Sequence, residues 1–150
     1  MIHLRSAQMS DGDLLFGWRN DPLTRASFRS TAAVPREDHD RWMKFNVAIG
    51  YPQHLVAIAQ SQGEDVGVIR FDACHDDLMA YEVSITMAPA HRGKGLSRLI
   101  LAEASGYMQD YCLRAEVRQE NTASRRIFER CGFTQIGTDG GFIKYRKESA

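Results

Sequence analysis

A short glycine-containing turn carries the chemistry that this sequence indicates most clearly. Gly93 and Gly95 follow an apolar stretch, and Arg92 and Lys94 stand beside them. Because glycine tolerates tight backbone curvature, successive N–H groups of such a turn can point into one concavity, and the positive end of a following helix adds to its attraction for anions. We therefore predict a pyrophosphate-binding turn at residues 92–97.

Regular elements on both sides would hold this turn in place. The residues before it alternate or run apolar as strands do, and apolar residues after it recur at helical spacing. The predicted elements are a strand over 2–6, helices over 10–20 and from 35, strands over 53–59, 66–71 and 79–87, a helix from 95, a strand over 113–117, a helix over 121–130, and strands over 133–136 and 142–145. A crossover helix would make the strand over 113–117 parallel to the one over 79–87.

Three details of this prediction concern the helices. Residues 24–34 show little periodicity, so we expect a surface loop there. In the helix that begins at Pro35, the predicted inward stripe is Trp42, Phe45 and Ile49. In the helix after the turn it is Leu96, Leu99, Ile100, Ala104, Tyr107, Met108 and Tyr111.

Length and composition limit the class of protein. A chain of 150 residues can bury one substantial core, and its 19 basic and 19 acidic residues give a formal net charge of zero, which does not favour nucleic-acid binding. No stretch approaches the roughly 20 apolar residues of a membrane helix, and no signal peptide is recognisable. Three widely spaced cysteines and the lack of metal-ligand spacing favour a cytoplasmic protein without a metal, a membrane or nucleic acid as partner.

Two sequence motifs stand in this order of elements, and the first is Arg92-x-x-Gly95-x-Ser97. It resembles the acetyl-CoA pyrophosphate loop of the GNAT N-acetyltransferase superfamily, (Arg/Gln)-x-x-Gly-x-(Gly/Ala), with serine at the last position. The second motif is Asn121-x-x-Ser124-x-x-x-Phe128-x-x-x-Gly132-Phe133, which is similar to the family's Asn-x-x-(Ala/Ser)-x-x-x-Tyr-x-x-x-Gly-Phe.

The resemblance implies an α/β fold and an activity. It implies a single GNAT domain over residues 1–150, with a mixed, mostly antiparallel sheet of about seven strands, a splayed parallel pair and about four flanking helices. The implied enzyme is an N-acetyltransferase that takes acetyl-CoA as co-substrate and a small-molecule amine as acceptor. A homodimer is left open.

The family's cofactor contacts imply roles for matching positions. Backbone groups at the splayed end of the strand over 81–87 would bind the pantetheine amides, and the N–H of Thr86 would stabilise the oxyanion. The implied cofactor-binding residues are Ile85, Thr86, Met87, Arg92, Gly93, Lys94, Gly95, Leu96, Ser97, Asn121, Ser124 and Phe128.

Acetyl transfer also needs groups that move protons. An alkyl ammonium has a pKa of about 10.4, so a base must make the amine neutral. Glu82 matches the general base of several family members, although a carboxylate on the solvated side of a strand is the alternative. Many relatives protonate the leaving thiolate with a tyrosine where this chain has Phe128, which leaves water, Tyr81, Tyr107 or Tyr111 for that step.

The N-terminal third would select the amine. The run Trp18-Arg19-Asn20-Asp21-Pro22 resembles the subgroup that includes acetyltransferases of nucleotide-linked amino sugars and of ribosomal-protein N-termini. Arginines could pair with a diphosphate and aromatic rings could stack on a base. The candidate substrate residues are Arg19, Arg25, Phe28, Arg29 and Trp42.

Other functions stay open on the sequence. Asp21, Glu37, Asp38 and Asp40 could serve a polyamine acceptor, and peptide N-termini are a further class. Trp42 could equally be a core residue between helices. Because Phe128 cannot donate a proton, a domain that binds acyl-CoA as a sensor without turnover is also retained.

Overall fold

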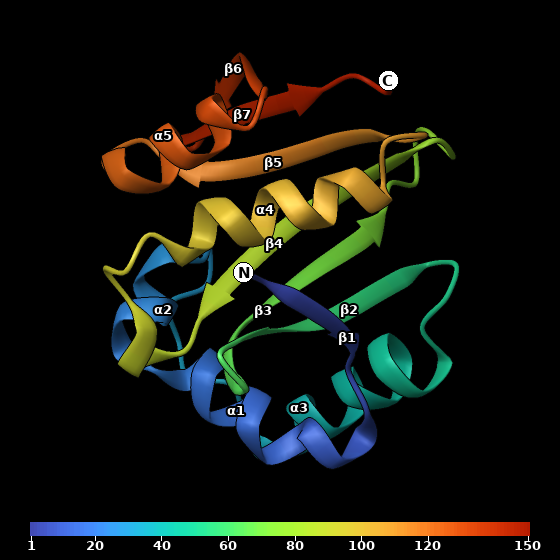
Figure 1. Cartoon of the computed structure of the whole chain (residues 1–150), viewed down its shortest axis with the longest axis vertical. Coiled ribbons are helices and arrows are strands. Elements are labelled where there is room, and N and C mark those ends of the chain that lie inside the picture. The colour runs from blue at the N-terminus through green and yellow to red at the C-terminus, as the bar shows by residue number, and fades with distance from the viewer.

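Seven strands form one continuous sheet in the computed structural model, which describes residues 1–150 (Figure 1). Along the sheet they are β1 (His3–Ser6), β2 (His54–Ser61), β3 (Glu64–Ala73), β4 (Ala80–Met87), β5 (Cys112–Arg118), β7 (Phe142–Lys147) and β6 (Thr134–Asp139). Neighbouring strands are antiparallel except β4 and β5, which are parallel. The predicted mixed sheet with one parallel pair is confirmed.

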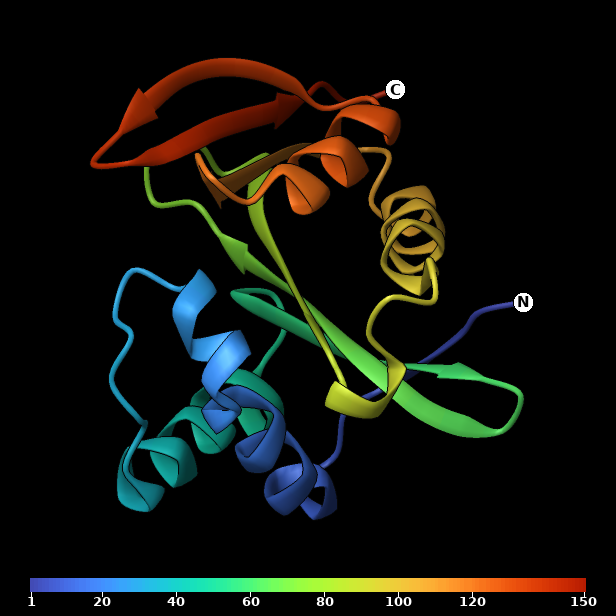
Figure 2. The same ribbon diagram turned by 90° about the vertical axis from the view of Figure 1, so that its left-hand side faces the viewer.

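Helices cover both faces of the sheet (Figure 2). On one face lie α4 (Leu96–Tyr107) and α5 (Thr122–Arg130), and on the other lie α1 (Gly12–Asn20), α2 (Pro22–Ser27) and α3 (Arg36–Met43). The π-helical segment η2 (Lys44–Ile49) continues α3, and short 3-10 turns form η1 (Met9–Asp11) and η3 (Pro89–His91). There are thus five α-helices where about four were predicted.

Two hydrophobic clusters follow from this layering. The larger one has 17 buried residues between the sheet and helices α4 and α5, with Ile100 and Leu101 of α4 fully buried. The smaller one has five, among them Trp18 and Met43, between the sheet and helices α1 and α3. On this face Arg70 of β3 and Ser84 and Thr86 of β4 belong to neither cluster and line a cavity instead.

The additional helix is α2, which occupies part of the segment predicted as a loop. Asp21 ends α1, but its carboxylate also accepts hydrogen bonds from the N–H groups of Leu23 and Thr24, at 3.1 and 3.3 Å. Pro22 then occupies the first turn, where the missing N–H costs nothing. The Asp-Pro pair therefore ends one helix and begins the next, and the loop prediction was wrong for residues 24–27.

The buried face of α3 differs from the predicted stripe. Phe45 and Ile49 are 52% and 61% exposed, whereas His39, Met43 and Asn46 are buried. The two polar residues are satisfied, because His39 Nε2 lies 2.8 Å from the carbonyl oxygen of Gly12 and Asn46 donates to the carbonyl of Trp42 at 2.9 Å. Hydropathy alone selected the wrong face.

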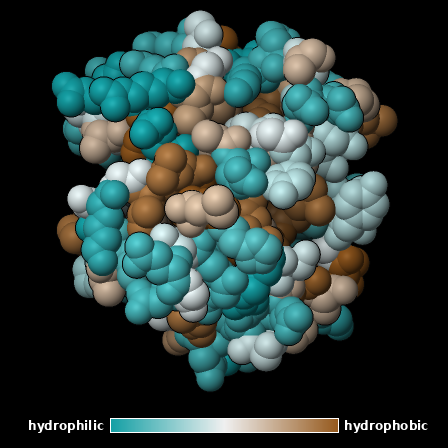
Figure 3. All heavy atoms as spheres, in the orientation of Figure 1, coloured by the Kyte–Doolittle hydropathy of each residue, from teal (hydrophilic) through white to brown (hydrophobic).

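Helix α4 shows a smaller discrepancy of the same kind. Tyr107 is 75% exposed and Leu99 is also exposed, while Leu101 and Ser105 are buried. Apolar side chains gather across the middle of the molecular face that carries α4 (Figure 3). An apolar groove of about 430 Å³ lies on this side of the sheet, between α4, η2 and strands β1 and β2.

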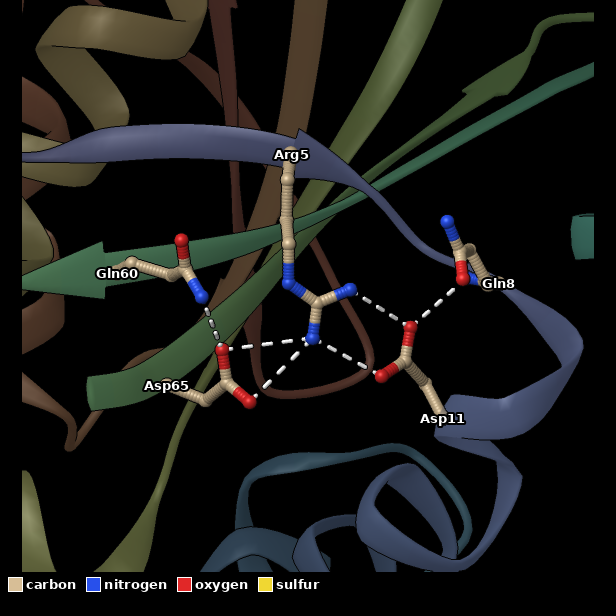
Figure 4. A network of polar contacts seen from close by, with 5 residues as sticks. All are labelled: Arg5, Gln8, Asp11, Gln60 and Asp65. Atoms are coloured by element: carbon tan, nitrogen blue, oxygen red, sulfur yellow. Dashed lines mark hydrogen bonds and ion pairs between the residues drawn. The ribbon is translucent and has the colours of Figure 1, made fainter. Parts of the chain in front are cut away.

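A polar brace ties β1 to the elements that follow it (Figure 4). Arg5 of β1 makes two hydrogen bonds to the carboxylate of Asp11, both at 2.9 Å, and reaches Asp65 at the start of β3 on its other side at 3.3 Å. Gln8 donates its N–H to Asp11 and Gln60 donates to Asp65. The guanidinium of Arg5 therefore has a full set of anionic partners.

Candidate active site

The parallel strands β4 and β5 pair over only a short stretch. Their register joins Ala80 to Cys112, Tyr81 to Leu113 and Glu82 to Arg114, and ends there. Beyond Glu82 the strands part, and a cleft of about 610 Å³ opens between them. It is lined by residues of α2, β3, β4, β5 and α5, including Ile85, Thr86 and Met87 of the predicted cofactor set.

The backbone of β4 offers unpaired groups to this cleft. In the antiparallel β3–β4 ladder, Ala88 donates to the carbonyl of Val66 at 2.9 Å, and the register continues without a shift. Because hydrogen-bonded and non-bonded pairs alternate, the N–H of Thr86 faces β3, whereas those of Ile85 and Met87 face the cleft. This orientation differs from the expectation that the N–H of Thr86 points at the thioester.

The predicted pyrophosphate turn lies at the open end of the cleft. Gly93 and Gly95 both have a φ of +75°, which a side chain would strain, and each would meet only open space with an added Cβ. Helix α4 begins at Leu96 with no side-chain cap, so its first N–H groups are free for a ligand. Lys94 is exposed beside them, and Ser97 lines the cleft. The residues present therefore fit a diphosphate.

Arg92 makes a contact that the sequence did not indicate. Its guanidinium forms an ion pair with Asp21 and donates to the hydroxyl of Thr24 at 2.8 Å. The hydrogen bond from Arg92 holds the pKa of Asp21 below its usual range. Arg92 still lines the cleft, and it links the turn before α4 to the start of α2.

The opposite wall of the cleft comes from α5. Asn121 caps this helix, since its side-chain oxygen accepts the N–H of Ser124 at 3.1 Å, and both residues line the cleft. Phe128 also lines it and is otherwise buried, with its ring against Phe133 and Tyr145. An apolar ring thus occupies the position at which the resemblance implied a tyrosine.

None of the three tyrosines considered as proton donors lines the cleft. Tyr81 donates its hydroxyl hydrogen to the carbonyl of Pro52 at 2.8 Å, and Tyr111 packs edge-on against its ring. Tyr107 is exposed on α4. The structure therefore brings no tyrosine hydroxyl of this group to the splayed strands.

Glu82 occupies the point at which the two strands separate. Glu82 is the last residue of β4 that pairs with β5, and its side chain is exposed to solvent and lines the cleft. Partial desolvation, followed by the charges of Glu116 and Asp72, raises the pKa of Glu82, while Arg70 counteracts this. A carboxylate with a raised pKa is a stronger base than an ordinary surface glutamate.

A second cavity of about 330 Å³ meets the cleft from the side of α1 and α3. Arg19, Phe28 and Trp42 of the predicted substrate set line it, together with Ser84 and Thr86 of β4. Five residues line both cavities, so the two spaces are continuous: Arg19, Phe28, Arg70, Ser84 and Thr86.

Among the lining residues that were not predicted as site residues, three are polar: His39, Arg70 and Ser84. His39 stacks on Trp42 with the ring centroids 5.8 Å apart. Arg70 and Ser84 face each other as partners in the β3–β4 ladder. Strand pairing brings these two residues together, and no local sequence signal marks it.

The remaining predicted substrate residues lie outside this second cavity. Arg25 does not line it. Arg29 forms a two-pronged ion pair with Glu116 of β5, both contacts at 2.9 Å, and reaches Asp139 at 3.2 Å. The hydrogen bond to Glu116 raises the pKa of Arg29. Arg29 thereby ties the segment after α2 to β5 and to the end of β6.

Two general features concern the kind of site. No group of three or more His, Cys, Asp or Glu side chains is placed to hold a metal ion. No helix has the length and apolar character required to cross a bilayer.

The sequence matches a family model described as acetyltransferase (GNAT) domain over residues 2–134. The chain belongs to this family, and the predicted enzyme class is confirmed. It is also 28% identical over 122 residues to the N-alpha-acetyltransferase RimI of Mycobacterium tuberculosis. The aligned region covers 77% of each of the two chains.

Solved structures agree on the fold. A spermidine N-acetyltransferase from Vibrio cholerae, in complex with CoA and spermine, has a TM-score of 0.82 at 18% identity and covers 97% of this chain and 92% of its own. The aminoglycoside acetyltransferase AAC(6')-Ib, in complex with coenzyme A, has a TM-score of 0.80 at 15% identity and covers 97% and 93%. Both structures contain coenzyme A, in agreement with the predicted co-substrate. The three relatives are named for different amines, so the family defines the reaction and not the acceptor.

Proposed function

We propose that residues 1–150 form one N-acetyltransferase domain, which moves the acetyl group of acetyl-CoA to a primary amine of a small molecule. The observation that carries this proposal is the continuity of two cavities at Ser84 and Thr86. The cleft would hold the extended co-substrate, and the second cavity, which we call the acceptor pocket, would hold the amine. The amine would meet the thioester where they join.

The residues of the cleft would have distinct roles in binding. The turn at 92–97 and the first turn of α4 would hold the pyrophosphate, and the free backbone groups of Ile85 and Met87 would pair with the pantetheine amides. We assign the oxyanion-stabilising N–H to Ile85 or Met87, because that of Thr86 faces β3. Asn121, Ser124 and Phe128 would form the opposite wall.

The reaction would proceed by direct attack. The amine nitrogen forms a bond to the thioester carbonyl carbon, the carbon–sulfur bond breaks, and the thiolate leaves. Glu82 takes the proton from the attacking nitrogen, directly or through water. Water protonates the thiolate, whose ordinary pKa near 8.5 makes this step feasible without a tyrosine.

An amino-sugar nucleotide is our first candidate acceptor, since Arg19, Phe28 and Trp42 place a cation and two aromatic rings around the pocket. A peptide N-terminus is the second, in line with the likeness to RimI. Polyamines are the third, in line with the likeness to a spermidine acetyltransferase. A sensor that binds acyl-CoA without turnover is the alternative from a different class.

The test is release of the CoA thiol from acetyl-CoA with an amino-sugar nucleotide, a peptide with a free N-terminus, spermidine and an aminoglycoside, repeated with Glu82→Gln. We expect turnover with at least one amine and a loss of about 100-fold or more in kcat for the variant. Because the protonated carboxyl cannot accept a proton, wild-type kcat should fall as pH drops through the raised pKa of Glu82. The variant should lack this limb of the profile.

Matched measurements separate an enzyme from a sensor. Glu103→Gln makes the same change on the exposed side of α4 and should leave kcat unaltered. Calorimetry should give similar acetyl-CoA affinity for wild type and Glu82→Gln. Saturable acetyl-CoA binding without turnover of any amine would favour the sensor, and absence of acetyl-CoA binding would refute the proposal.

A further inference from the structure

Among the half-buried arginines of this chain, two have neither an ion-pair partner nor a side-chain hydrogen bond. Arg19 and Arg25 are half-buried, and neither has an ion pair or a side-chain hydrogen bond. The other half-buried arginines contact a carboxylate, a carbonyl or a hydroxyl oxygen: Arg5, Arg70, Arg92, Arg114, Arg118, Arg125 and Arg146. An unpaired, partly desolvated cation costs free energy in the folded protein.

Arg19 is the one of this pair that lines the acceptor pocket. Its guanidinium carbon lies 3.9 Å above the ring of Phe28, which covers one face of the group and fixes its orientation. Its Nη1 atom is buried without a hydrogen-bond partner. Burial lowers the pKa of Arg19, and the positive charges of Arg70 and Arg25 lower it further.

The other charged groups around the pocket do not neutralise Arg19. Asp38 lines the pocket, but its carboxylate is ion-paired with Arg41. Arg70 Nε lies 3.2 Å from a carboxylate oxygen of Asp72, and the guanidinium carbon of Arg70 is 5.8 Å from the ring centroid of Trp42. Arg70 therefore places a second positive charge near Arg19, and its own carboxylate partner, Asp72, does not contact Arg19.

Resting on the proposed function, we infer that the acceptor of this pocket is an amine that also carries an anionic group, a carboxylate or a phosphate, which the guanidinium of Arg19 binds. The anion supplies the partner that the protein itself does not. Charge-assisted hydrogen bonds to a planar guanidinium suit both groups. The amine of the same molecule would then reach toward Ser84 and Thr86, where the pocket meets the cleft.

Size and charge narrow the acceptor further. A pocket of about 330 Å³ is at the lower end of ligand sites, so it holds a small amine or one part of a larger one. A polyamine or an aminoglycoside would bring several positive charges next to Arg19 and Arg70, with like-charge repulsion as the result. The inference therefore separates this chain from its polycation-modifying relatives.

The experiment compares matched acceptors that differ in the anion. CoA release is measured with glucosamine 6-phosphate against glucosamine, and with alanine against alaninamide. We expect a kcat/KM at least tenfold higher for the anionic member of one pair, and the pair that responds identifies phosphate or carboxylate. Arg19→Gln should lower kcat/KM for that member by about 10- to 100-fold and change that of the neutral member by less than about threefold.

Controls keep the inference falsifiable. Arg126→Gln removes the same charge from the exposed side of α5 and should change neither ratio. Equal kcat/KM within both pairs, or an Arg19→Gln loss that appears instead in KM for acetyl-CoA, would overturn it. If no amine is turned over, calorimetry measures the affinity for the same pairs in the presence of CoA. Equal affinities within both pairs refute the anion site. Tighter binding of the anionic member supports the anion site and leaves only the proposed reaction in question.

Discussion

Arg5 and Arg19 are both half-buried arginines of the N-terminal third, and they differ in what surrounds them. Two carboxylates enclose Arg5, which joins β1, η1 and β3 (Figure 4). A phenylalanine ring covers Arg19, and no anion lies within ion-pair distance. The first arrangement stabilises the fold. The unpaired guanidinium of Arg19 lowers the stability of the folded protein, and on our inference the anionic group of the ligand compensates for this cost when it binds. Binding sites commonly lower stability in this way.

The largest effect on stability should follow removal of the enclosed guanidinium. Arg5→Met would leave Asp11, whose side chain is 11% exposed, without its cation. We expect the free energy of unfolding in urea to fall by about 2 to 3 kcal/mol. Arg41→Met is the control, because its pair with Asp38 is exposed and should contribute less than about 0.5 kcal/mol. Equal losses for both variants would contradict the comparison.

A smaller effect on stability should follow replacement of Asp11, the carboxylate partner of Arg5. The hydrogen bond from Arg5 lowers the pKa of Asp11 in the folded protein. This stabilisation is complete above the unfolded carboxyl pKa of about 3.9 and is lost as pH falls through the lower folded value. Asp11→Asn should cost about 1 to 2 kcal/mol at pH 7 and make the acid-side decline in stability shallower. An unchanged decline in urea titrations between pH 6 and 3 would count against this role.

The smallest effect on stability should come from Arg19. Arg19→Met removes an unpaired cation and keeps an apolar side chain against Phe28. We expect the free energy of unfolding to stay within about 0.5 kcal/mol of wild type or to rise, because no carboxylate loses a partner. A loss above about 1.5 kcal/mol would mean that Arg19 serves the fold, which would remove the basis of the contrast with Arg5.

Much of the architecture could be predicted because local signals agreed with it. The glycine turn before α4 and the alternation in the strands both have short-range causes. The order of elements along the chain and the parallel pair could therefore be predicted. The missed helix α2 has such a cause as well, since Asp21-Pro22 is a helix start signal, whereas we predicted only that the preceding helix ends at residue 20. The face of α3 could not follow from hydropathy, because His39 and Asn46 are buried through hydrogen bonds to distant or backbone partners.

The candidate site was less predictable where it depends on contacts far apart in the sequence. Arg92 and Asp21 are 71 positions apart, and Arg29 and Glu116 are 87 apart. Arg70 enters the pocket through the register of β3 with β4. Residue type showed that arginines were available, but only the fold shows which of them already has a partner.

The parting of β4 and β5 also has a mechanical consequence. Three residue pairs join these strands, against seven between β3 and β4 and six between β5 and β7. The ladder between β4 and β5 is therefore the shortest in the sheet, and one hydrophobic cluster continues across the place where it ends. A molecule bound in the gap would contact β4 on one side and β5 and α5 on the other, and would add a connection between the two halves of the sheet where the backbone pairing has stopped.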